Sequence, residues 1–366
     1  MWLNKIALTN FRNYDFESLE FSEGTNVISG QNAQGKTNLL ESVNMLSCGK
    51  SFRTRYDREL ISFNSSCGEI LADVYSHERE QTICIKMETG RPKKITVNGV
   101  KKKACELSQL VNVVLFCPDD LNLIKDGAAV RRKLLDNAIS QIRPRYAEIL
   151  AEYNKLYEHK TRILKDWHEK PSLLDMLDDF SEGMCRASAQ IIRYRAAFTK
   201  KLNELAPPIH SEFSGNGEKL DINYKTVSTV KNPFAASREI YYEICEHQER
   251  HRQAELDAAQ CLTGIHKDDL EISINGRSAR NFASQGQTRT AALSLKLAER
   301  EIFLEETGEY PILLLDDVLS ELDSKRQEFV LNRIGGGQTL ISCCEDEEIS
   351  KKTGGKVIFV ERGRIR

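Results

Sequence analysis

The sequence predicts an α/β protein whose two end thirds fold together around an inserted, mostly helical lobe. Three observations support this fold class. An apolar strand at residues 25–29 enters a glycine-rich segment that is followed by a helical stretch. Residues 69–100 alternate between apolar and polar, which is typical of antiparallel strands. From residue 119 to about 260, apolar residues instead recur at spacings of three and four, which indicates helices.

The first third is expected to combine one helix with a mixed sheet. Residues 2–8 predict the first strand, and the helix after the glycine-rich segment should run from Thr37 to about Ser47. Within the alternating region, Asn98-Gly99 is a strong signal for a hairpin turn.

The middle third is predicted to be a compact lobe of antiparallel helices. Asp119-Asp120 marks a helix start, and breaks are expected at Pro171, at Pro207-Pro208 and around residues 215–217. No heptad repeat is sustained along this region, so the sequence disfavours a long coiled-coil arm.

The α/β character returns in the last third. Residues 270–274 alternate as a strand, Ser284 to about Glu306 is a good helix-forming segment, and residues 311–315 and 338–344 read as buried strands. The predicted organisation is therefore one α/β domain built from residues 1–118 and 261–366, with a helical domain, residues 119–260, inserted into it.

Composition limits the class of protein. The chain has 366 residues, with 40% hydrophobic and 29% charged, which fits a globular protein of roughly two domains. No stretch approaches the roughly eighteen apolar residues of a membrane span, and Asn4 and Lys5 interrupt any signal peptide. We therefore expect a cytoplasmic protein with no membrane partner. The ten cysteines include no Cys-x-x-Cys pair, which favours reduced thiols over zinc or redox sites.

Residues 30–37 have the pattern of a phosphate-binding loop. Glycines at both ends let the backbone turn sharply and direct its N–H groups at phosphate oxygens, next to the positive end of the following helix. Lys36 would reach the terminal phosphates, and the Thr37 hydroxyl would bind Mg²⁺. We therefore expect ATP and Mg²⁺ as cofactors, held by Gly30, Gln31, Asn32, Ala33, Gln34, Gly35, Lys36 and Thr37.

Two carboxylates end the apolar strand near residue 315. Asp316 would hold Mg²⁺ beside Thr37, and Asp317 would orient or deprotonate the attacking water. Strands often end in Asp for helix capping, so the pair is weak evidence alone and becomes strong together with the upstream loop.

A further polar segment, Ser284-Gln285-Gly286-Gln287, precedes the long helix of the last third. Ser284 is a preferred N-cap residue, which is one interpretation. The segment also presents a hydroxyl and free N–H groups at a positive helix end, as a γ-phosphate would require. The motif alone does not separate these readings.

The net charge of −2 excludes a protein that coats nucleic acid through its overall field, so any such surface must be local. Two candidate clusters exist, Lys101-Lys102-Lys103 and Arg131-Arg132-Lys133. Charge runs alone favour the simpler reading of a solvated hairpin and a charged helix face, and nothing chooses between the clusters.

Several motifs carry a resemblance to a known family. Residues 30–37, 284–287, 316–317 and 320–323 resemble the phosphate loop, signature motif, Walker B strand and D-loop of ABC-type ATPases. Residues 8–14, 49–54, 131–136 and 264–270 are similar, more specifically, to the bacterial RecF family. The similarity extends from end to end.

This resemblance implies an ABC/SMC-type P-loop ATPase head that forms a homodimer around ATP. The signature of each copy would face the loop of the other, so the implied catalytic residues are Lys36, Ser284, Gly286, Gln287, Asp316 and Asp317. RecF proteins bind DNA in that state and act with RecR and RecO to load RecA at single-strand gaps and support the SOS response. A weak, DNA-stimulated ATPase activity would reset the clamp.

Some features depart from the wider pattern or stay open. Many ABC heads have Glu at the position of Asp317, and residues 343–346, Cys-Cys-Glu-Asp, stand where many transporters place a switch His. Arg12 and Asn13 either approach the nucleotide or form a polar turn, and His266 is either at a site edge or structural. Rival functions are the ATPase subunit of a transporter and a metabolic P-loop kinase, which would leave residues 284–287 unexplained.

Overall fold

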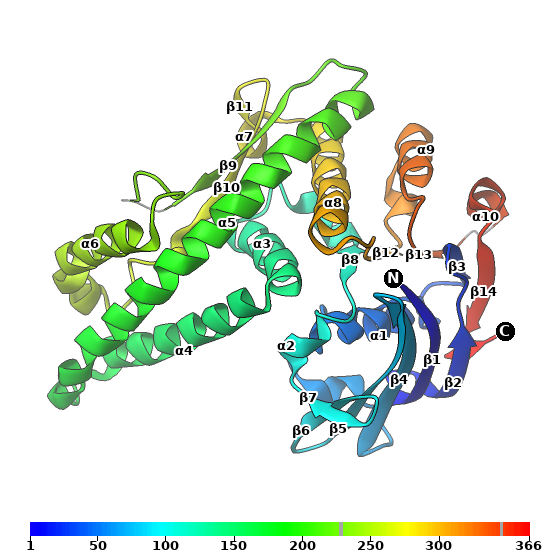
Figure 1. Cartoon of the computed structure of the whole chain (residues 1–366), viewed down its shortest axis with the longest axis horizontal. Coiled ribbons are helices and arrows are strands. Elements are labelled where there is room, and N and C mark those ends of the chain that lie inside the picture. The colour runs from blue at the N-terminus through cyan, green and yellow to red at the C-terminus, as the bar shows by residue number, and fades with distance from the viewer. Residues whose placement is uncertain (227–229, 345–346) are drawn as a thin grey trace. The chain divides into compact units, whose positions relative to one another are not determined.

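The computed structural model describes residues 1–226, 230–344 and 347–366, which form two compact units. The first unit joins residues 1–122 to residues 295–366, and the second holds residues 123–294 (Figure 1). The second unit extends beyond the predicted boundary at 260. The reason is that strand β10 (Asp269–Ile274) pairs with β9 (Leu220–Lys225) and not with a sheet of the first unit.

An antiparallel sheet forms one layer of the first unit, in the order β2-β1-β4-β5-β6-β7. Its strands are β1 (Trp2–Phe11), β2 (Tyr14–Glu20), β4 (Cys67–Ser76), β5 (Arg79–Glu88), β6 (Arg91–Val97) and β7 (Val100–Lys102). The predicted turn at Asn98-Gly99 joins β6 to β7, and both residues have positive φ, 49° and 78°, as a type I′ hairpin requires.

The second sheet of this unit brings the two ends of the chain together, in the order β15-β14-β3-β13-β12-β8. Its strands are β3 (Thr25–Ser29), β8 (Val113–Phe116), β12 (Ile312–Asp316), β13 (Thr339–Cys343), β14 (Lys356–Glu361) and β15 (Arg364–Ile365). All neighbours are parallel except β15, which forms a hairpin with β14. The carboxyl ends of β3, β12 and β13 therefore meet at one edge, which is where loops of parallel sheets build sites.

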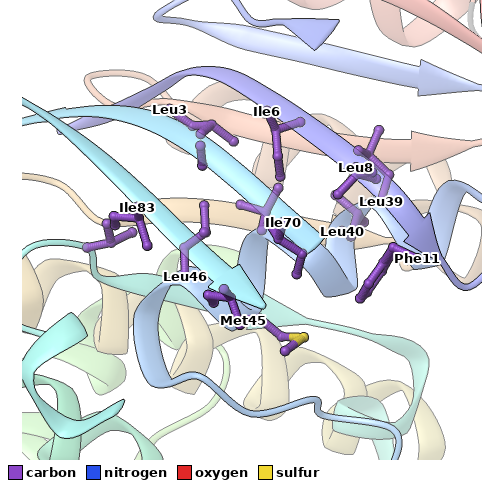
Figure 2. Close-up of a cluster of buried hydrophobic side chains, with 14 of the residues drawn as sticks. Leu3, Ile6, Leu8, Phe11, Leu39, Leu40, Met45, Leu46, Ile70 and Ile83 are labelled. Atoms are coloured by element: carbon purple, nitrogen blue, oxygen red, sulfur yellow. The ribbon is translucent and has the colours of Figure 1, made fainter. Parts of the chain in front are cut away.

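Helix α1 (Lys36–Cys48) supplies the core between the two sheets. Figure 2 shows side chains of α1 meeting those of the antiparallel sheet, with Leu39, Leu40, Met45 and Leu46 beside Leu3, Ile6, Leu8, Phe11, Ile70 and Ile83. Ile28, Leu314 and Leu340 of the parallel sheet belong to the same buried cluster. Each such side chain contributes about 1.5–3 kcal/mol on burial, so this core fixes the helix that follows the phosphate loop.

The second unit is built around one long helix. Helices α3 (Ala128–Ile142), α4 (Pro144–Asp166) and α6 (Ser237–Ala258) pack on α5 (Leu177–Phe213), and β9, β10 and β11 (Arg277–Ser278) form a small antiparallel sheet. Helix α8 (Gln285–Thr307) starts in this unit and ends in the other. The remaining elements are η1 (Asp57–Leu60), α2 (Ala104–Leu107), η2 (Pro118–Asn122), η3 (Pro171–Met176), η4 (Ile265–Lys267), α7 (Ala279–Phe282), η5 (Leu319–Glu321), α9 (Ser324–Arg333) and α10 (Glu347–Thr353). Among the described residues, no helix combines the length and apolar character of a membrane span.

Two expectations for the helical region are wrong. Asp119-Asp120 lies in the short 3₁₀-helix η2, and the first long helix begins only at Ala128. The break at Pro207-Pro208 does not occur, because α5 continues through both prolines to Phe213. Proline inside a helix costs about 3 kcal/mol, which the buried residues around it, Leu202, Ala206, Ile209 and His210, offset by packing.

Candidate nucleotide site

The phosphate loop follows β3 at the carboxyl edge of the parallel sheet. A Cβ at Gly30 would lie 2.3 Å from the carbonyl oxygen of Val360, so no other residue fits there. Gly35 has a φ of 123°, and a Cβ there would lie 2.9 Å from the Asn13 amide nitrogen. Both positions therefore need glycine, because neighbouring atoms approach too closely to leave room for a Cβ.

Neighbouring segments hold the loop from behind. The Tyr14 hydroxyl donates to the Gly35 carbonyl at 2.9 Å, and the Asn13 amide donates to the Gln34 carbonyl at 2.9 Å. The backbone N–H of Gly363, in the turn between β14 and β15, donates to the same Gln34 carbonyl at 2.9 Å. Burial raises the pKa of Tyr14, which keeps its phenol a donor. Asn13 thus positions the loop backbone, whereas the sequence offered only a nucleotide contact or a polar turn for this residue.

Lys36 lies over the loop. Its side chain is buried, and its Nζ donates to the Gly30 carbonyl at 2.7 Å and to the Gln31 carbonyl at 3.2 Å. The same Nζ lies 3.6 Å from the Sγ of Cys344, which in turn donates to Asn32 Oδ1 at 3.0 Å. Cys344 is exposed and belongs to the edge of this site, in the segment that stands where many transporters place a switch His and to which the sequence assigned no role. Residues 345–346 of the same segment lie outside the described residues.

The carboxylate at the end of β12 meets the loop directly. The Thr37 hydroxyl donates to Asp316 Oδ1 at 2.9 Å, and so does the Ser342 hydroxyl at the end of β13, also at 2.9 Å. Burial raises the pKa of Asp316, against the opposing effect of these two hydrogen bonds. Mg²⁺ prefers hydroxyl and carboxylate oxygens, and a nearby cation would stabilise this buried charge. The donor set therefore fits Mg²⁺.

Asp317 has an unusual backbone. Its φ of 51° lies in the left-handed region, which costs a residue other than glycine about 1–3 kcal/mol in such sites. Two serine hydroxyls hold this conformation, since Ser342 accepts from the Asp317 N–H at 2.8 Å and Ser320 donates to its carbonyl at 2.6 Å. Ser342 therefore contacts both carboxylate residues and is a second functional candidate that the sequence did not reveal.

The signature segment lies in the second unit, at the start of α8. The N–H of Ser284 donates to Gln287 Oε1 at 2.8 Å, and the N–H of Gln287 donates to Ser284 Oγ at 3.2 Å. This is a reciprocal capping box. Gln287 also donates to Glu218 Oε1 at 2.8 Å. The structure therefore contains the helix cap that one interpretation of the segment predicted. Contact of Ser284, Gly286 and Gln287 with a nucleotide stays a prediction.

The two basic clusters differ in accessibility. Lys101 and Lys103 are exposed, whereas Lys102 is paired with Glu106 at 2.9 Å. In the other cluster Lys133 is exposed and Arg132 donates to the Asp268 carbonyl at 2.7 Å.

Arg131, one of the candidate residues for DNA contact, lies in a buried ion pair. Its guanidinium is buried and binds both oxygens of Asp269, at 2.7 and 2.9 Å. A buried cation needs such a partner, and burial makes this guanidinium a poorer candidate for a phosphate contact than the exposed Lys133.

This ion pair belongs to a larger polar network in the second unit. Arg195 is buried and binds both oxygens of Asp136 at 2.9 Å and Asp268 at 3.3 Å, while the Tyr146 and Tyr224 hydroxyls donate to these two carboxylates. Two of the motifs similar to the RecF family, residues 131–136 and 264–270, therefore meet in one structural cluster. The sequence could not show this, because the partners are far apart along the chain.

His266 and Arg12 also have structural roles. His266 shares hydrogen bonds with the Tyr153 hydroxyl at 2.9 Å and the Cys261 carbonyl at 3.2 Å, and burial lowers its pKa to about 4. Arg12 binds both oxygens of the buried Glu41 at 2.8 Å. These contacts support the structural readings of His266 and of Arg12.

Comparison with known proteins completes the assignment. The RecF/RecN/SMC N terminal domain model matches residues 2–364. The chain is 41% identical over 370 residues to the DNA replication and repair protein RecF of Clostridium botulinum (strain ATCC 19397 / Type A), covering 100% of both chains. It is 39% identical to the RecF of Acetivibrio thermocellus, over 100% of this chain and 99% of that relative.

Solved structures agree with this result. A structure of the recombination mediator protein RecF-ATPrS in the RecFOR pathway is 36% identical and matches with a TM-score of 0.93, over 100% of this chain and 97% of that one. An Smc head domain from Pyrococcus furiosus, 16% identical, covers 100% of this chain and 95% of that one with a TM-score of 0.58, which shows a shared fold. The fold is thus the predicted ABC/SMC-type head with an inserted lobe, and the chain belongs to the bacterial RecF family of DNA replication and repair proteins.

Proposed function

We propose that this chain is an ATP-dependent DNA-binding clamp of recombinational repair and replication restart. The observation that carries the proposal is the contact between Thr37 and Asp316, which brings the phosphate loop and the Walker B carboxylate into one site in a chain of the RecF family. Related RecF structures described with ATP and ATPrS support ATP as the nucleotide.

Each residue of the site has a defined task in this proposal. The N–H groups of residues 30–35 bind phosphate oxygens, and Lys36 exchanges the Gly30 and Gln31 carbonyls for the terminal phosphates. Mg²⁺, when bound, neutralises charge on the phosphates, and Thr37 and Asp316 would hold it. Asp317 orients or deprotonates the attacking water. Hydrolysis is slow and resets the clamp.

The clamp itself is a homodimer closed by ATP. Ser284, Gly286 and Gln287 of one copy face the γ-phosphate held by residues 30–37 of the other copy. The positive end of α8 suits this task, because helix N-termini stabilise anions. In that closed state the protein binds DNA at single-strand gaps.

The partners follow from the RecF family. We propose that the DNA-bound dimer acts in the cytoplasm with RecR and RecO to load RecA and support the SOS response, with DNA stimulating a weak ATPase activity. The similar structure is described as part of the RecFOR pathway, which supports these partners. Full-length identity to RecF proteins favours this function over a transporter's ATPase subunit.

Mass measurements with and without nucleotide test the clamp. Wild-type protein with Mg²⁺ and a non-hydrolysable ATP analogue should sediment as a dimer and bind gapped DNA, whereas Lys36→Met should remain a monomer. Lys155→Met, an exposed lysine in α4, is the matched control and should behave as wild type. If the wild-type protein stays a monomer under saturating nucleotide and DNA, the proposal is contradicted.

A mixing experiment tests closure in trans. Lys36→Met and Ser284→Arg should each lack ATPase activity alone. Their heterodimer has one doubly damaged site and one intact site, so mixing should restore up to half of the wild-type activity per dimer. Absence of recovery despite confirmed heterodimers would place the signature away from the partner's loop.

A further inference from the structure

Helix α5 presents a row of cations to solvent in the second unit. Between residues 183 and 200 its exposed residues are Arg186, Arg193, Ala197 and Lys200. The three cations are seven residues apart, so they lie on one face of the helix about 10 Å from one another. No acid occurs between Glu182 and Glu204. This face is therefore a positive strip about 20 Å long.

A cleft opens at one end of this strip, between α5 and α6. It has a volume of about 550 Å³ and is lined by Arg186, Ala189, Gln190, Ser237, Arg238, Tyr241 and Tyr242. Ser237 and Arg238 are the first residues of α6, whose N-cap residue, Ala236, offers no side-chain cap. Arg193 reaches this end of α6, since its guanidinium donates to Ser237 Oγ at 3.0 Å.

Two aromatic rings form one wall of the cleft. The rings of Tyr241 and Tyr242 are 5.5 Å apart in an edge-to-face arrangement, and 55% of Tyr242 is exposed. The Arg238 guanidinium stands 5.6 Å from the Tyr242 ring and donates to its hydroxyl. Two of the lining residues contact Glu182, which binds Arg186 at 2.7 Å and accepts from the Tyr241 hydroxyl at 3.4 Å.

We propose that this cleft binds an unstacked nucleotide of single-stranded DNA, with the strand continuing along Arg193 and Lys200. The inference rests on the proposed DNA-binding function and assigns it a contact surface. In this arrangement the arginines would bind a backbone phosphate and the tyrosine ring would stack on the adjacent base. Proteins that bind single strands without sequence preference use this combination of groups. Duplex DNA keeps its bases stacked and offers none to the cleft.

The assignment can be tested by measuring the binding of a fluorescent oligo-dT of fifteen nucleotides to the full chain. Each measurement is made with and without an ATP analogue. Arg186→Glu with Arg238→Glu should weaken binding at least tenfold, and removal of two phosphate contacts should reduce the salt slope by about 1.4. Tyr242→Ala should weaken binding by about 5- to 150-fold, whereas Tyr242→Phe, which keeps the ring, should stay within about threefold of wild type. Duplex affinity should change less in every variant.

Arg250→Glu is the matched control. Arg250 lies on α6, is 59% exposed and is held by Glu246 one turn earlier, much as Arg186, 70% exposed, is held by Glu182. Its replacement should leave oligo-dT binding within twofold of wild type. Circular dichroism confirms that each variant is folded.

Three results would overturn the assignment. The first is a double variant, Arg186→Glu with Arg238→Glu, whose oligo-dT affinity and salt slope equal those of wild type. The second is a loss of oligo-dT affinity in Arg250→Glu as large as the loss in the double variant. The third is an acidic peptide that binds the wild-type cleft while oligo-dT fails to displace it. If the cleft variants bind gapped DNA as tightly as the wild-type protein does, only the assignment of the cleft fails. If wild-type protein binds no DNA under any nucleotide condition, the proposed function fails with it.

Discussion

The Thr37 hydroxyl donates a 2.9 Å hydrogen bond to the carboxylate of Asp316, 279 residues further along the chain. This contact exists because β3 and β12 lie on either side of β13 in one parallel sheet and end at the same edge. The bond places a hydroxyl and a carboxylate oxygen together beside the phosphate loop. Four expected outcomes follow from this site and from the buried polar groups of the second unit.

Asp316→Asn should lower the ATPase activity without lowering the stability of the nucleotide-free protein. We expect ATPase activity to fall at least about 100-fold, because the variant loses the charged oxygen that would hold Mg²⁺. Without nucleotide the variant should melt no lower than wild type, since burial raises the pKa of Asp316 and makes its charge unfavourable there. Steady-state hydrolysis over a magnesium titration and thermal melting check this pair of results. A variant with wild-type activity would remove Asp316 from the site.

Cys344 should react with N-ethylmaleimide faster while the loop is empty than while it holds nucleotide. Its exposed thiol lies 3.6 Å from Lys36 Nζ, so an adduct would occupy space beside the terminal phosphates. ATP with Mg²⁺ should slow its alkylation about tenfold or more, and alkylated protein should lose ATP binding. Peptide mass spectrometry measures the modification at each cysteine.

Two controls accompany the alkylation experiment. Cys67 in β4 is also exposed and should react at the same rate with and without ATP. Cys344→Ser should bind ATP and resist inactivation by the reagent. Equal labelling of Cys344 in both conditions would show that the thiol does not face the nucleotide.

Arg131→Ala should destabilise the protein by about 2 kcal/mol or more. The substitution removes the buried guanidinium that binds the half-buried carboxylate of Asp269 and donates to three backbone carbonyls. Lys133→Ala, two residues away and exposed, should change the free energy of unfolding by less than about 0.5 kcal/mol. Urea denaturation compares the two variants. A small effect at Arg131 would contradict its structural role.

His266 should make stability fall in mild acid. Burial lowers its pKa from 6.5 to about 4, so the folded state holds the imidazole neutral while the unfolded state binds a proton below about pH 6.5. The neutral imidazole therefore costs no stability above pH 6.5. As the pH falls from 6.5 towards 4, proton binding by the unfolded state progressively lowers the free energy of unfolding. The free energy of unfolding falls by about 3 kcal/mol across that window.

Unfolding experiments between pH 7 and 4.5 measure this dependence. His266→Asn should show a flatter profile than wild type, whatever its absolute stability. His168→Asn, which replaces an exposed histidine of the same unit, should keep the wild-type profile. Identical slopes in wild type and His266→Asn would contradict the buried neutral state.

The sequence by itself determined the local chemistry of this protein. Residues 25–47 contain a strand, a loop with glycine at both ends and a helix in one continuous stretch, so their pattern predicts their structure without outside help. The two carboxylates at residues 316–317 and the hairpin at Asn98-Gly99 are equally local. Their signals depend on backbone preferences and on spacing along the chain, which a sequence records directly.

Only the tertiary structure decided which distant groups meet. It placed Ser342 and Cys344 at the loop edge, assigned Arg131 to a buried ion pair, and joined β9 to β10 so that the second unit reaches residue 294. It also carried α5 through two prolines. The physical reason is that burial and pairing depend on partners tens to hundreds of residues away, and their free energy outweighs the local preferences that the sequence makes visible.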